Sequence, residues 1–313
     1  MMIRSPKLTT LFIALLSAIA GFGQYYSNSD KPFLFEAGIG LGGMNCATDL
    51  GGPRGRGGYY LNEINWQNTE LSGSIYASML YKHVVGVRLE YTAGAVRAYD
   101  TILKGIATEK AIGRYERNLS FRSSIRELAI LGEFHPLMMG QFEDKMPVFS
   151  PYLLAGVGVF AFDPKASLNG NWVRLHPLRT EGQGFPEYPD RKPYRLTQTN
   201  LSFGGGVRIE LRRFNMRLEA LNRRLHTDYL DDVSTNYIDP YLFDRYLDPA
   251  LVNSARALYN RSTVATGSTI KRGNAKNSDA YITVNIKVGF KLGMGEPEYG
   301  SRRTKSRIGC KRI

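Results

Sequence analysis

Four histidines are the side chains of this 313-residue sequence best suited to catalysis or metal binding, and they lie at positions 83, 135, 176 and 226. No two of them have the spacing of metal ligands on a helix, so the sequence predicts no metal site. His176 or His226 beside a strand-end serine could act on lipid, but no motif fixes such a pair. Glycine runs at 38–43 and 204–206 lack the helix that must follow a dinucleotide-binding fingerprint. We therefore expect neither a cofactor nor enzyme activity.

The composition excludes several other classes of protein. The chain is 43% hydrophobic, too apolar for a disordered protein, and its mean hydropathy of −0.27 excludes a bundle of membrane helices. Cys46 and Cys310 are too far apart in sequence for a clustered-cysteine zinc site. The net charge is +13, but no binding motif accompanies it, so we expect no nucleic-acid partner.

Residues 1–23 have the pattern of a secretory signal peptide. Arg4 and Lys7 precede a short apolar run over residues 8–20, and Gly21 and Gly23 place cleavage before residue 24. The alternative is a membrane anchor, but the run is shorter than the ~20 residues of a spanning helix. We expect an exported protein.

Strict alternation of polar and apolar residues dominates the rest of the chain. Residues 281–292 put Ile, Val, Phe and Leu on one face and Tyr, Thr, Asn and Lys on the other, which is typical of a strand with one apolar face. Eight such strands are expected near 33–43, 70–81, 85–97, 119–135, 149–162, 198–211, 216–229 and 280–292.

The lengths of the connections distinguish two all-β folds. Alternation alone also permits a soluble sandwich. Long connections follow the first, third, fifth and seventh strands and short ones follow the others, as in transmembrane barrels. We therefore predict an eight-stranded antiparallel transmembrane β-barrel over residues 24–292, in the outer membrane of a Gram-negative bacterium with both termini periplasmic.

The polar faces of the strands carry charges of both signs, which the barrel would turn inward. They are Arg88, Glu90, Glu127, Glu133, Arg208, Glu210, Arg217, Glu219, Lys287 and Lys291. Eight strands leave a lumen that side chains just fill, and unpaired buried charges are costly. We expect these residues to pair as a polar plug and not to line a conducting pathway.

Other charged residues have more than one interpretation. Arg122 and Arg126 could pair with Glu from the third or fifth strand. Asp228, Asp231 and Asp232 could hold a cation, although turn capping is the simpler role. The basic long loops suit the phosphates of outer-membrane lipid and lipopolysaccharide. The basic segment 293–313 is either a solvated periplasmic tail or a docking arm for an acidic partner.

Several stretches resemble PorG-like outer-membrane barrels of the type IX secretion system. They are 38–43 with 49–52, 117–123, 227–234 and 272–274, and the run Thr-Asp-Tyr-Leu-Asp-Asp-Val-Ser at 227–234 is the most specific. The motif residues are Asn118, Ser120, Phe121, Arg122, Asp228, Tyr229, Asp231 and Asp232. The connections at 163–197 and 231–279 look longer than is typical of the family.

The resemblance implies a non-enzymatic role in protein secretion, linked to gliding in some members. Such barrels associate with a periplasmic ring made of a lipoprotein (PorK-like) and its partner (PorN-like). Two alternatives stay open: a structural or adhesive surface barrel, and a lipid A-modifying enzyme. Loss of binding on loop shortening would favour the adhesive barrel.

Overall fold

The computed structural model describes residues 32–52, 65–140, 147–211, 213–262, 264, 270–275 and 278–292. The expected signal peptide (1–23) and basic tail (293–313) lie outside these ranges. Nine strands are described: β1 (Phe33–Ala47), β2 (Glu70–Tyr81), β3 (Val85–Tyr99), β4 (Ser120–Phe134), β5 (Phe149–Leu168), β6 (Asn171–Arg174), β7 (Thr197–Leu211), β8 (Phe214–Leu225) and β9 (Ala280–Leu292).

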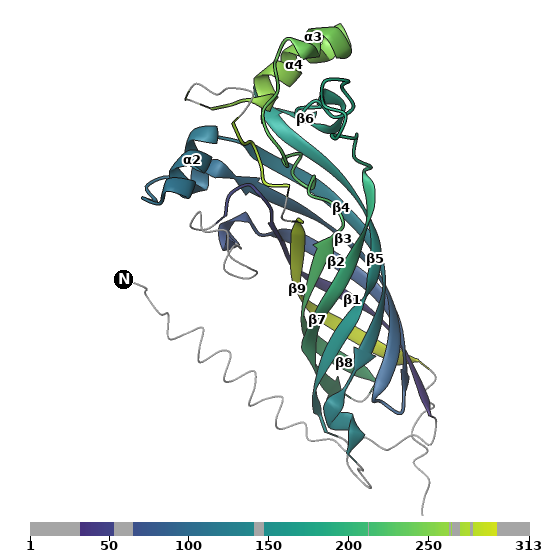
Figure 1. The fold of residues 1–313 in the computed structure, drawn as a ribbon. Coiled ribbons are helices and arrows are strands. Elements are labelled where there is room, and N and C mark those ends of the chain that lie inside the picture. The colour runs from purple at the N-terminus through teal and green to yellow at the C-terminus, as the bar shows by residue number, and fades with distance from the viewer. Residues whose placement is uncertain are drawn as a thin grey trace, which may run out of the picture.

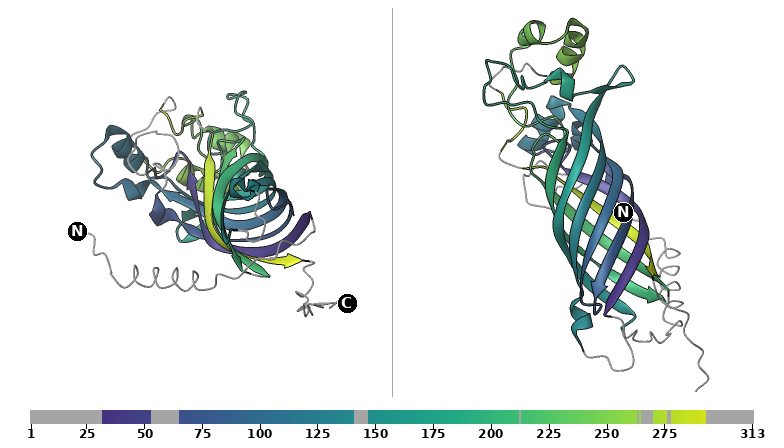
Figure 2. Two further views of the ribbon diagram at one scale, coloured as in Figure 1. Left: turned by 90° about the horizontal axis from the view of Figure 1, so that it is seen from below. Right: turned by 90° about the vertical axis from the view of Figure 1, so that its right-hand side faces the viewer.

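Eight of these strands form a closed antiparallel barrel, which confirms the predicted fold (Figure 1). Each strand pairs with its neighbours in sequence, and β1 closes the ring by pairing with β9 along its length. The strands cross the barrel axis at a slant (Figure 2). Three strand ends differ most from the prediction. β1 runs on to Ala47, β8 ends at Leu225, and β5 runs on past residue 162 to form a hairpin with the short β6.

The connections divide the barrel into a turn end and a loop end. The turn end has the connections at 82–84, 135–148 and 212–213, and the long connections gather at the loop end (Figure 1). These long connections carry helices that alternation did not predict: α2 (Glu109–Arg117), α3 (Leu242–Tyr246) and α4 (Pro249–Tyr259). Asp248 caps the N-terminus of helix α4, because its side chain accepts a 2.9 Å hydrogen bond from Ala250 N.

The described long connections pack together into what we call the cap. Its apolar core includes Leu50, Leu178, Phe185, Leu230, Val233, Phe243 and Leu258, and it continues into the barrel mouth through Phe121, Phe160, Phe162 and Tyr281. The loops thus fold over the lumen and close it with apolar side chains at the loop end.

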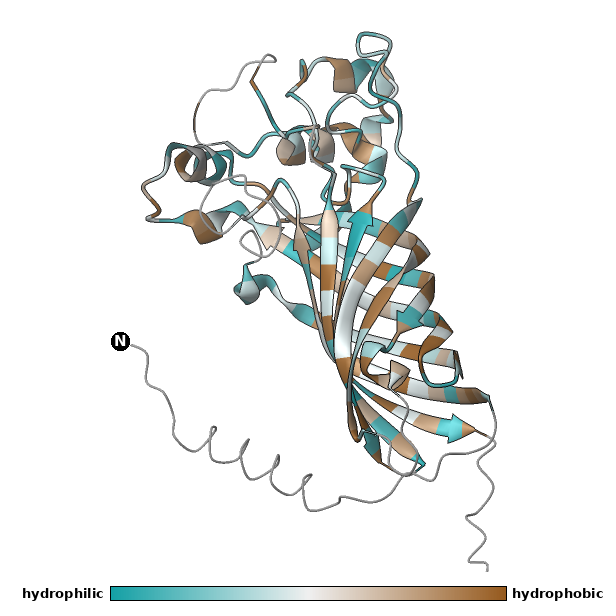
Figure 3. Cartoon of the chain, turned by 60° about the horizontal axis from the view of Figure 1, so that its bottom comes forward, coloured by the Kyte–Doolittle hydropathy of each residue, from teal (hydrophilic) through white to brown (hydrophobic). Residues whose placement is uncertain are grey.

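The outer wall of the barrel is apolar, and hydrophobic and hydrophilic residues alternate along its strands (Figure 3). Residues at alternate positions project outward, and large aliphatic side chains there are 36–77% exposed: Ile39, Leu41, Leu71, Ile75, Val87, Leu89, Leu128, Ile130, Leu153, Val157, Val159, Leu201, Leu218, Val284 and Ile286. Exposed aromatic residues gather near the turn end, where the rings of Phe33 and Tyr81 lie 5.2 Å apart and those of Phe214 and Phe290 lie 5.3 Å apart. The protein is therefore apolar outside and charged inside, the arrangement of a lipid-embedded barrel. Among the described helices, none is long and apolar enough to cross a membrane.

Candidate functional site: the lumen network and the cap

The lumen holds equal numbers of positive and negative side chains in the described strands. The six cations are Arg88, Arg208, Arg217, Arg223, Lys287 and Lys291, and the six carboxylates are Glu36, Glu90, Glu127, Glu133, Glu210 and Glu219. Their side chains are at most 9% exposed, and each takes part in at least one ion pair. All ten charges placed on the polar faces by alternation thus lie in the lumen.

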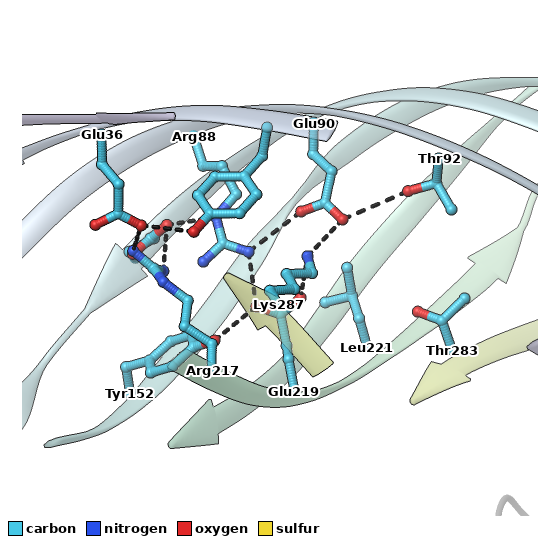
Figure 4. A network of polar contacts seen from close by, with 12 residues as sticks. Glu36, Arg88, Glu90, Thr92, Tyr152, Arg217, Glu219, Leu221, Thr283 and Lys287 are labelled. Atoms are coloured by element: carbon cyan, nitrogen blue, oxygen red, sulfur yellow. Dashed lines mark hydrogen bonds and ion pairs between the residues drawn. The ribbon is translucent and has the colours of Figure 1, made fainter. Parts of the chain in front are cut away.

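Arg88 is the centre of the network (Figure 4). Its guanidinium contacts Glu133, lies 2.6 Å from Glu219 and 3.2 Å from Glu90. Lys287 lies 2.5 Å from Glu90 and 2.7 Å from Glu219, so the two cations share the same two carboxylates. These residues come from β3, β4, β8 and β9 and therefore join strands on different sides of the barrel.

A second group of ion pairs lies toward the turn end. Arg217 bridges Glu36 at 2.7 Å and Glu133 at 3.0 Å. Arg208 bridges Glu36 at 2.9 Å and Glu210 at 2.7 Å, and Lys291 lies 2.5 Å from Glu210. Because every carboxylate meets a cation, the arrangement lowers the cost of burying charge in a narrow lumen.

Two tyrosines fill the space between the charges. The Tyr76 hydroxyl donates to Glu36 at 2.6 Å, and its ring lies 4.9 Å from the Arg88 guanidinium. The Tyr152 hydroxyl donates to Glu219 at 2.7 Å. The rings give the guanidinium groups a favourable face to lie on and leave less room for water.

A glycine makes room for this packing. A Cβ atom at Gly289 would collide with the Glu36 carboxylate and the Tyr76 hydroxyl, and would lie 2.8 Å from Asn215 Oδ1. The glycines at 38, 40, 42, 204 and 206 have the same role, because a Cβ atom at each of them would lie less than 3.0 Å from a neighbouring atom.

Glu36 and Arg223 belong to the lumen network but were not predicted. Arg223 lies on the same face of β8 as Arg217 and Glu219. Continuing the alternation four residues beyond Glu219 would therefore have predicted that Arg223 faces the lumen. Its guanidinium lies 3.0 Å from Glu127. Glu36 was hidden because the glycines at 38, 40 and 42 occupy the same face and interrupt the polar pattern.

A Ser–His–Glu arrangement closes the turn end of the lumen. His135 Nδ1 lies 3.2 Å from Ser150 Oγ, and Nε2 lies 3.3 Å from Glu133. All three residues are at most 3% exposed, and Glu133 is held by Arg88 and Arg217. The His135 ring also stacks on Tyr152 with centroids 5.0 Å apart. The arrangement therefore packs the turn end of the lumen with side chains that are almost fully buried.

The two histidines of the enzyme alternative lie elsewhere. His226 Nδ1 lies 2.7 Å from Thr199 Oγ1 on the surface. His176 bonds the Tyr194 carbonyl at 2.9 Å in a shallow cleft of about 270 Å³. That cleft is lined by His176, Pro177, Arg179, Gln183, Pro193 and Tyr194, a set without a serine. Among the described residues, no group of three His, Cys, Asp or Glu side chains could hold a metal ion.

The stretches behind the family resemblance, apart from 38–43 on β1, meet at one place in the cap. Arg117 donates to Asp100 at 2.8 and 2.9 Å, to Asp49 O at 2.9 Å and to Arg272 O at 2.5 Å. Arg272 in turn lies 3.0 Å from Glu181 and donates to Asp232 O. We call this assembly of Asp49, Asp100, Arg117, Glu181, Asp232 and Arg272 the cap joint.

The carboxylates of 227–234 have different roles in and around the joint. Asp231 Oδ1 caps Val233 N at 2.9 Å, and Asp232 accepts a 2.7 Å hydrogen bond from the Tyr194 hydroxyl. Burial raises the pKa of Asp232 to about 6. Burial and neighbouring carboxylates raise the pKa of Asp231 to about 8 and that of Asp228 to about 9. At pH 7 the protonated form of Asp228 and Asp231 therefore predominates in the folded cap, whereas Asp232 is mostly ionised.

The other motif residues pack around the same region. Asn118 ends α2 in the left-handed conformation with φ of 56°, and the Ser120 hydroxyl accepts a 3.3 Å hydrogen bond from Arg261. Phe121 is fully buried in the barrel mouth, and the Tyr229 ring stacks on Tyr194 at 4.9 Å.

The expected partners of Arg122 and Arg126 were wrong. Both side chains lie on the outer wall, whereas Glu90, the one glutamate of β3, points into the lumen, and β5 contains no glutamate. Arg122 instead lies 3.5 Å from Glu70 on β2, and Arg126 makes no ion pair with any residue that the structure describes. Arg122 and Arg126 occupy even positions of β4, and the lumen-facing Glu127 occupies an odd one. Alternation along the strand therefore predicts that the two arginines face outward.

No family model matches the chain, and no curated protein matches its sequence. Among solved structures, Ail, the attachment invasion locus protein of Yersinia pestis, aligns over 83% of this chain and 97% of its own at 9% identity and a TM-score of 0.33. Neisserial surface protein A aligns over 85% and 100% at 8% identity and a TM-score of 0.36. The N-terminal β-barrel domain of Pseudomonas aeruginosa OprF aligns over 84% and 98% at 9% identity and a TM-score of 0.31. The TM-scores of these alignments are low. The assignment of this chain as a closed eight-stranded barrel therefore depends on the pairing of its own strands.

Proposed function

We propose that this chain spans the outer membrane as a barrel with a filled lumen and acts without catalysis in protein secretion. The observation that supports the membrane location is the inverted barrel, with exposed Leu, Ile and Val outside and twelve paired charges inside. An apolar wall of this extent needs lipid around it.

The secretion role rests on the resemblance to PorG-like barrels and on the place of its motifs. Segments 49–52, 117–123, 227–234 and 272–274 are far apart in sequence, yet they join through Arg117 and Arg272. The motif residues of these four segments therefore belong to one structural unit. On this proposal, the turn end and the residues beyond 292 contact the periplasmic ring lipoprotein and its partner.

The test is affinity capture of the full chain from detergent-solubilised outer membranes, followed by mass spectrometry. Recovery of a ring lipoprotein and its periplasmic partner would support the proposal. Deleting the gene should also abolish secretion of cargo that bears the matching C-terminal signal. Normal secretion, or capture of the barrel alone while the ring stays intact, would overturn it.

An adhesive surface barrel is the second candidate, and the packed cap favours it. A cap with its own apolar core and a buried Arg272–Glu181 pair presents a rigid surface beyond the barrel. Shortening 231–279 should abolish surface binding if the protein is an adhesin, and should leave secretion unchanged if the ring contact lies at the turn end.

A further inference from the structure

A band of cations crosses the outer wall of the barrel near the loop end. Strand register places Arg97, Arg122, Lys165 and Arg174 side by side on β3, β4, β5 and β6. Their side chains are 35–54% exposed. With Arg126, four residues further along β4, they form what we call the cationic band.

The acidic residues beside the band only partly neutralise it. Glu70 lies 3.0 Å from Arg97 and 3.5 Å from Arg122, and Asp163 lies 2.9 Å from Arg174 and 3.4 Å from Lys165. Five cations thus face two carboxylates, which leaves an excess of three positive charges on this part of the wall.

Arg126 has the most demanding environment of the five. Its register neighbours are Ala93 on β3 and Ala161 on β5, and within the described ranges no acidic group pairs with it. The next outward row is Tyr91, Leu128 and Val159, each 41–52% exposed, followed by Leu89, Ile130 and Val157. Arg126 therefore lies at the border where the apolar wall begins.

A charged group at this border has one well-suited partner. If the wall lies in lipid, acyl chains cover the rows of Leu128 and Ile130, and headgroup phosphates lie at the level of Arg126. Arg binds phosphate through paired N–H donors, a geometry that its planar guanidinium favours.

The separation of Arg122 and Arg126 along β4 indicates which kind of phosphorylated lipid fits the band. Four residues separate Arg126 from the row of Arg122, which corresponds to about 14 Å along a strand. A headgroup with two phosphates on a sugar frame spans this separation with one phosphate at each arginine, whereas a single phosphate reaches both only if the two side chains bend toward one point between them. The exposed Ser124 lies between the two arginines on the same face.

We propose that the cationic band binds a multiply phosphorylated glycolipid, with its phosphates on Arg122 and Arg126 and its acyl chains along the rows of Leu128 and Ile130. This inference rests on the proposed membrane location and is independent of any secretion partner. It names a defined lipid site on one sector of the barrel.

The test is native mass spectrometry of the purified full chain in detergent with added diphosphoryl lipid A. The variant R122Q/R126Q should retain at least about tenfold less lipid A than the wild type. The control R195Q/R224Q removes the same charge from two exposed arginines outside the band and should change retention less than twofold. Lipid A stripped of both phosphates should not be retained by the wild type.

Three results would overturn the proposal. They are unchanged retention in R122Q/R126Q, an equal loss in R195Q/R224Q, and equal retention of phosphate-free lipid. The assay contains no ring component, so its outcome is separate from that of the capture experiment.

Discussion

The Tyr76 hydroxyl donates a 2.6 Å hydrogen bond to Glu36, and the two groups together occupy the space that a side chain at residue 289 would need. The lumen is therefore packed to the limit at this point. The close packing of the lumen and the pairing of its charges should determine the stability and the conductance of the barrel, which can be measured in variants with one or two substitutions.

The first prediction concerns the space at Gly289. G289A should destabilise the barrel by about 1–3 kcal/mol, because the new methyl group displaces Glu36 or Tyr76 from a filled interior. The measurement is urea unfolding in detergent. G132A is the matched control, since a Cβ atom there lies 3.5 Å from the nearest backbone atom and meets ordinary contact. Equal stability of the two variants would contradict the packing.

The second prediction concerns the pair of Glu127 and Arg223. E127Q should cost about 3–5 kcal/mol, because it leaves the buried Arg223 guanidinium without its carboxylate. The double variant E127Q/R223M should be more stable than the sum of the two single changes predicts. Additive free energies of unfolding in this cycle would show that the two residues do not interact.

The third prediction concerns conduction through the lumen. The wild type should show no stepwise current in a planar bilayer, because charged and aromatic side chains fill the barrel from end to end. The variant Y76A/R217A opens space beside the ion pairs and should conduct more than the wild type. Regular current steps from the wild type would refute the plug.

The fourth prediction concerns the cap joint. R272M removes the partner of Glu181, whose carboxylate accepts hydrogen bonds from Ser234 N and Thr235 N at 2.9 Å. Hydrogen exchange of these two amides should accelerate by more than tenfold. R256M is the control, because the exposed pair of Arg256 and Asp244 contributes up to about 1 kcal/mol. Unchanged protection in R272M would show that the joint does not hold the cap.

The fifth prediction concerns pH. Asp231 and Asp232 have folded pKa values raised to about 8 and about 6, above the ordinary value near 4. The folded cap therefore binds protons more tightly than the unfolded chain does, so this contribution to its stability is complete below about pH 4 and is lost as the pH rises from about 4 to about 8. Burial is the largest cause of both shifts. Asp49 raises the pKa of Asp231 further, whereas Arg117 lowers the pKa of Asp231 and Arg272 lowers that of Asp232.

Limited proteolysis of the cap at pH 6 and pH 9 measures this effect. Cleavage should be faster at pH 9, and D231N should reduce the difference, whereas the exposed-site variant D190N should not. Resistance that increases with pH would contradict the assigned direction.

Sequence patterns predicted the barrel well because the barrel is built from alternation. Each strand has one face in lipid and one in the lumen, so parity alone places Arg88, Glu90 and Lys287 inside. The cap was not predictable in the same way. Its core combines short helices with irregular segments, and residues such as Arg117 and Arg272 gain their roles from contacts across 155 positions of sequence. The same alternation places Arg122 and Arg126 on the outer wall, so the wrong expectation for their partners came from not applying it to β4.

The ion pairs of the lumen constrain the order in which the protein can assemble. Arg217 meets Glu36 across 181 residues, and Lys287 meets Glu90 across 197. Until β9 reaches β1, most of these charges lack partners, and a half-formed sheet would expose them to lipid. Strand-by-strand delivery into the bilayer is therefore unfavourable, and the ring must close at or before insertion. Barrel closure is thus a late, cooperative step, and any factor that inserts this protein has to shelter the open seam until the last strand arrives.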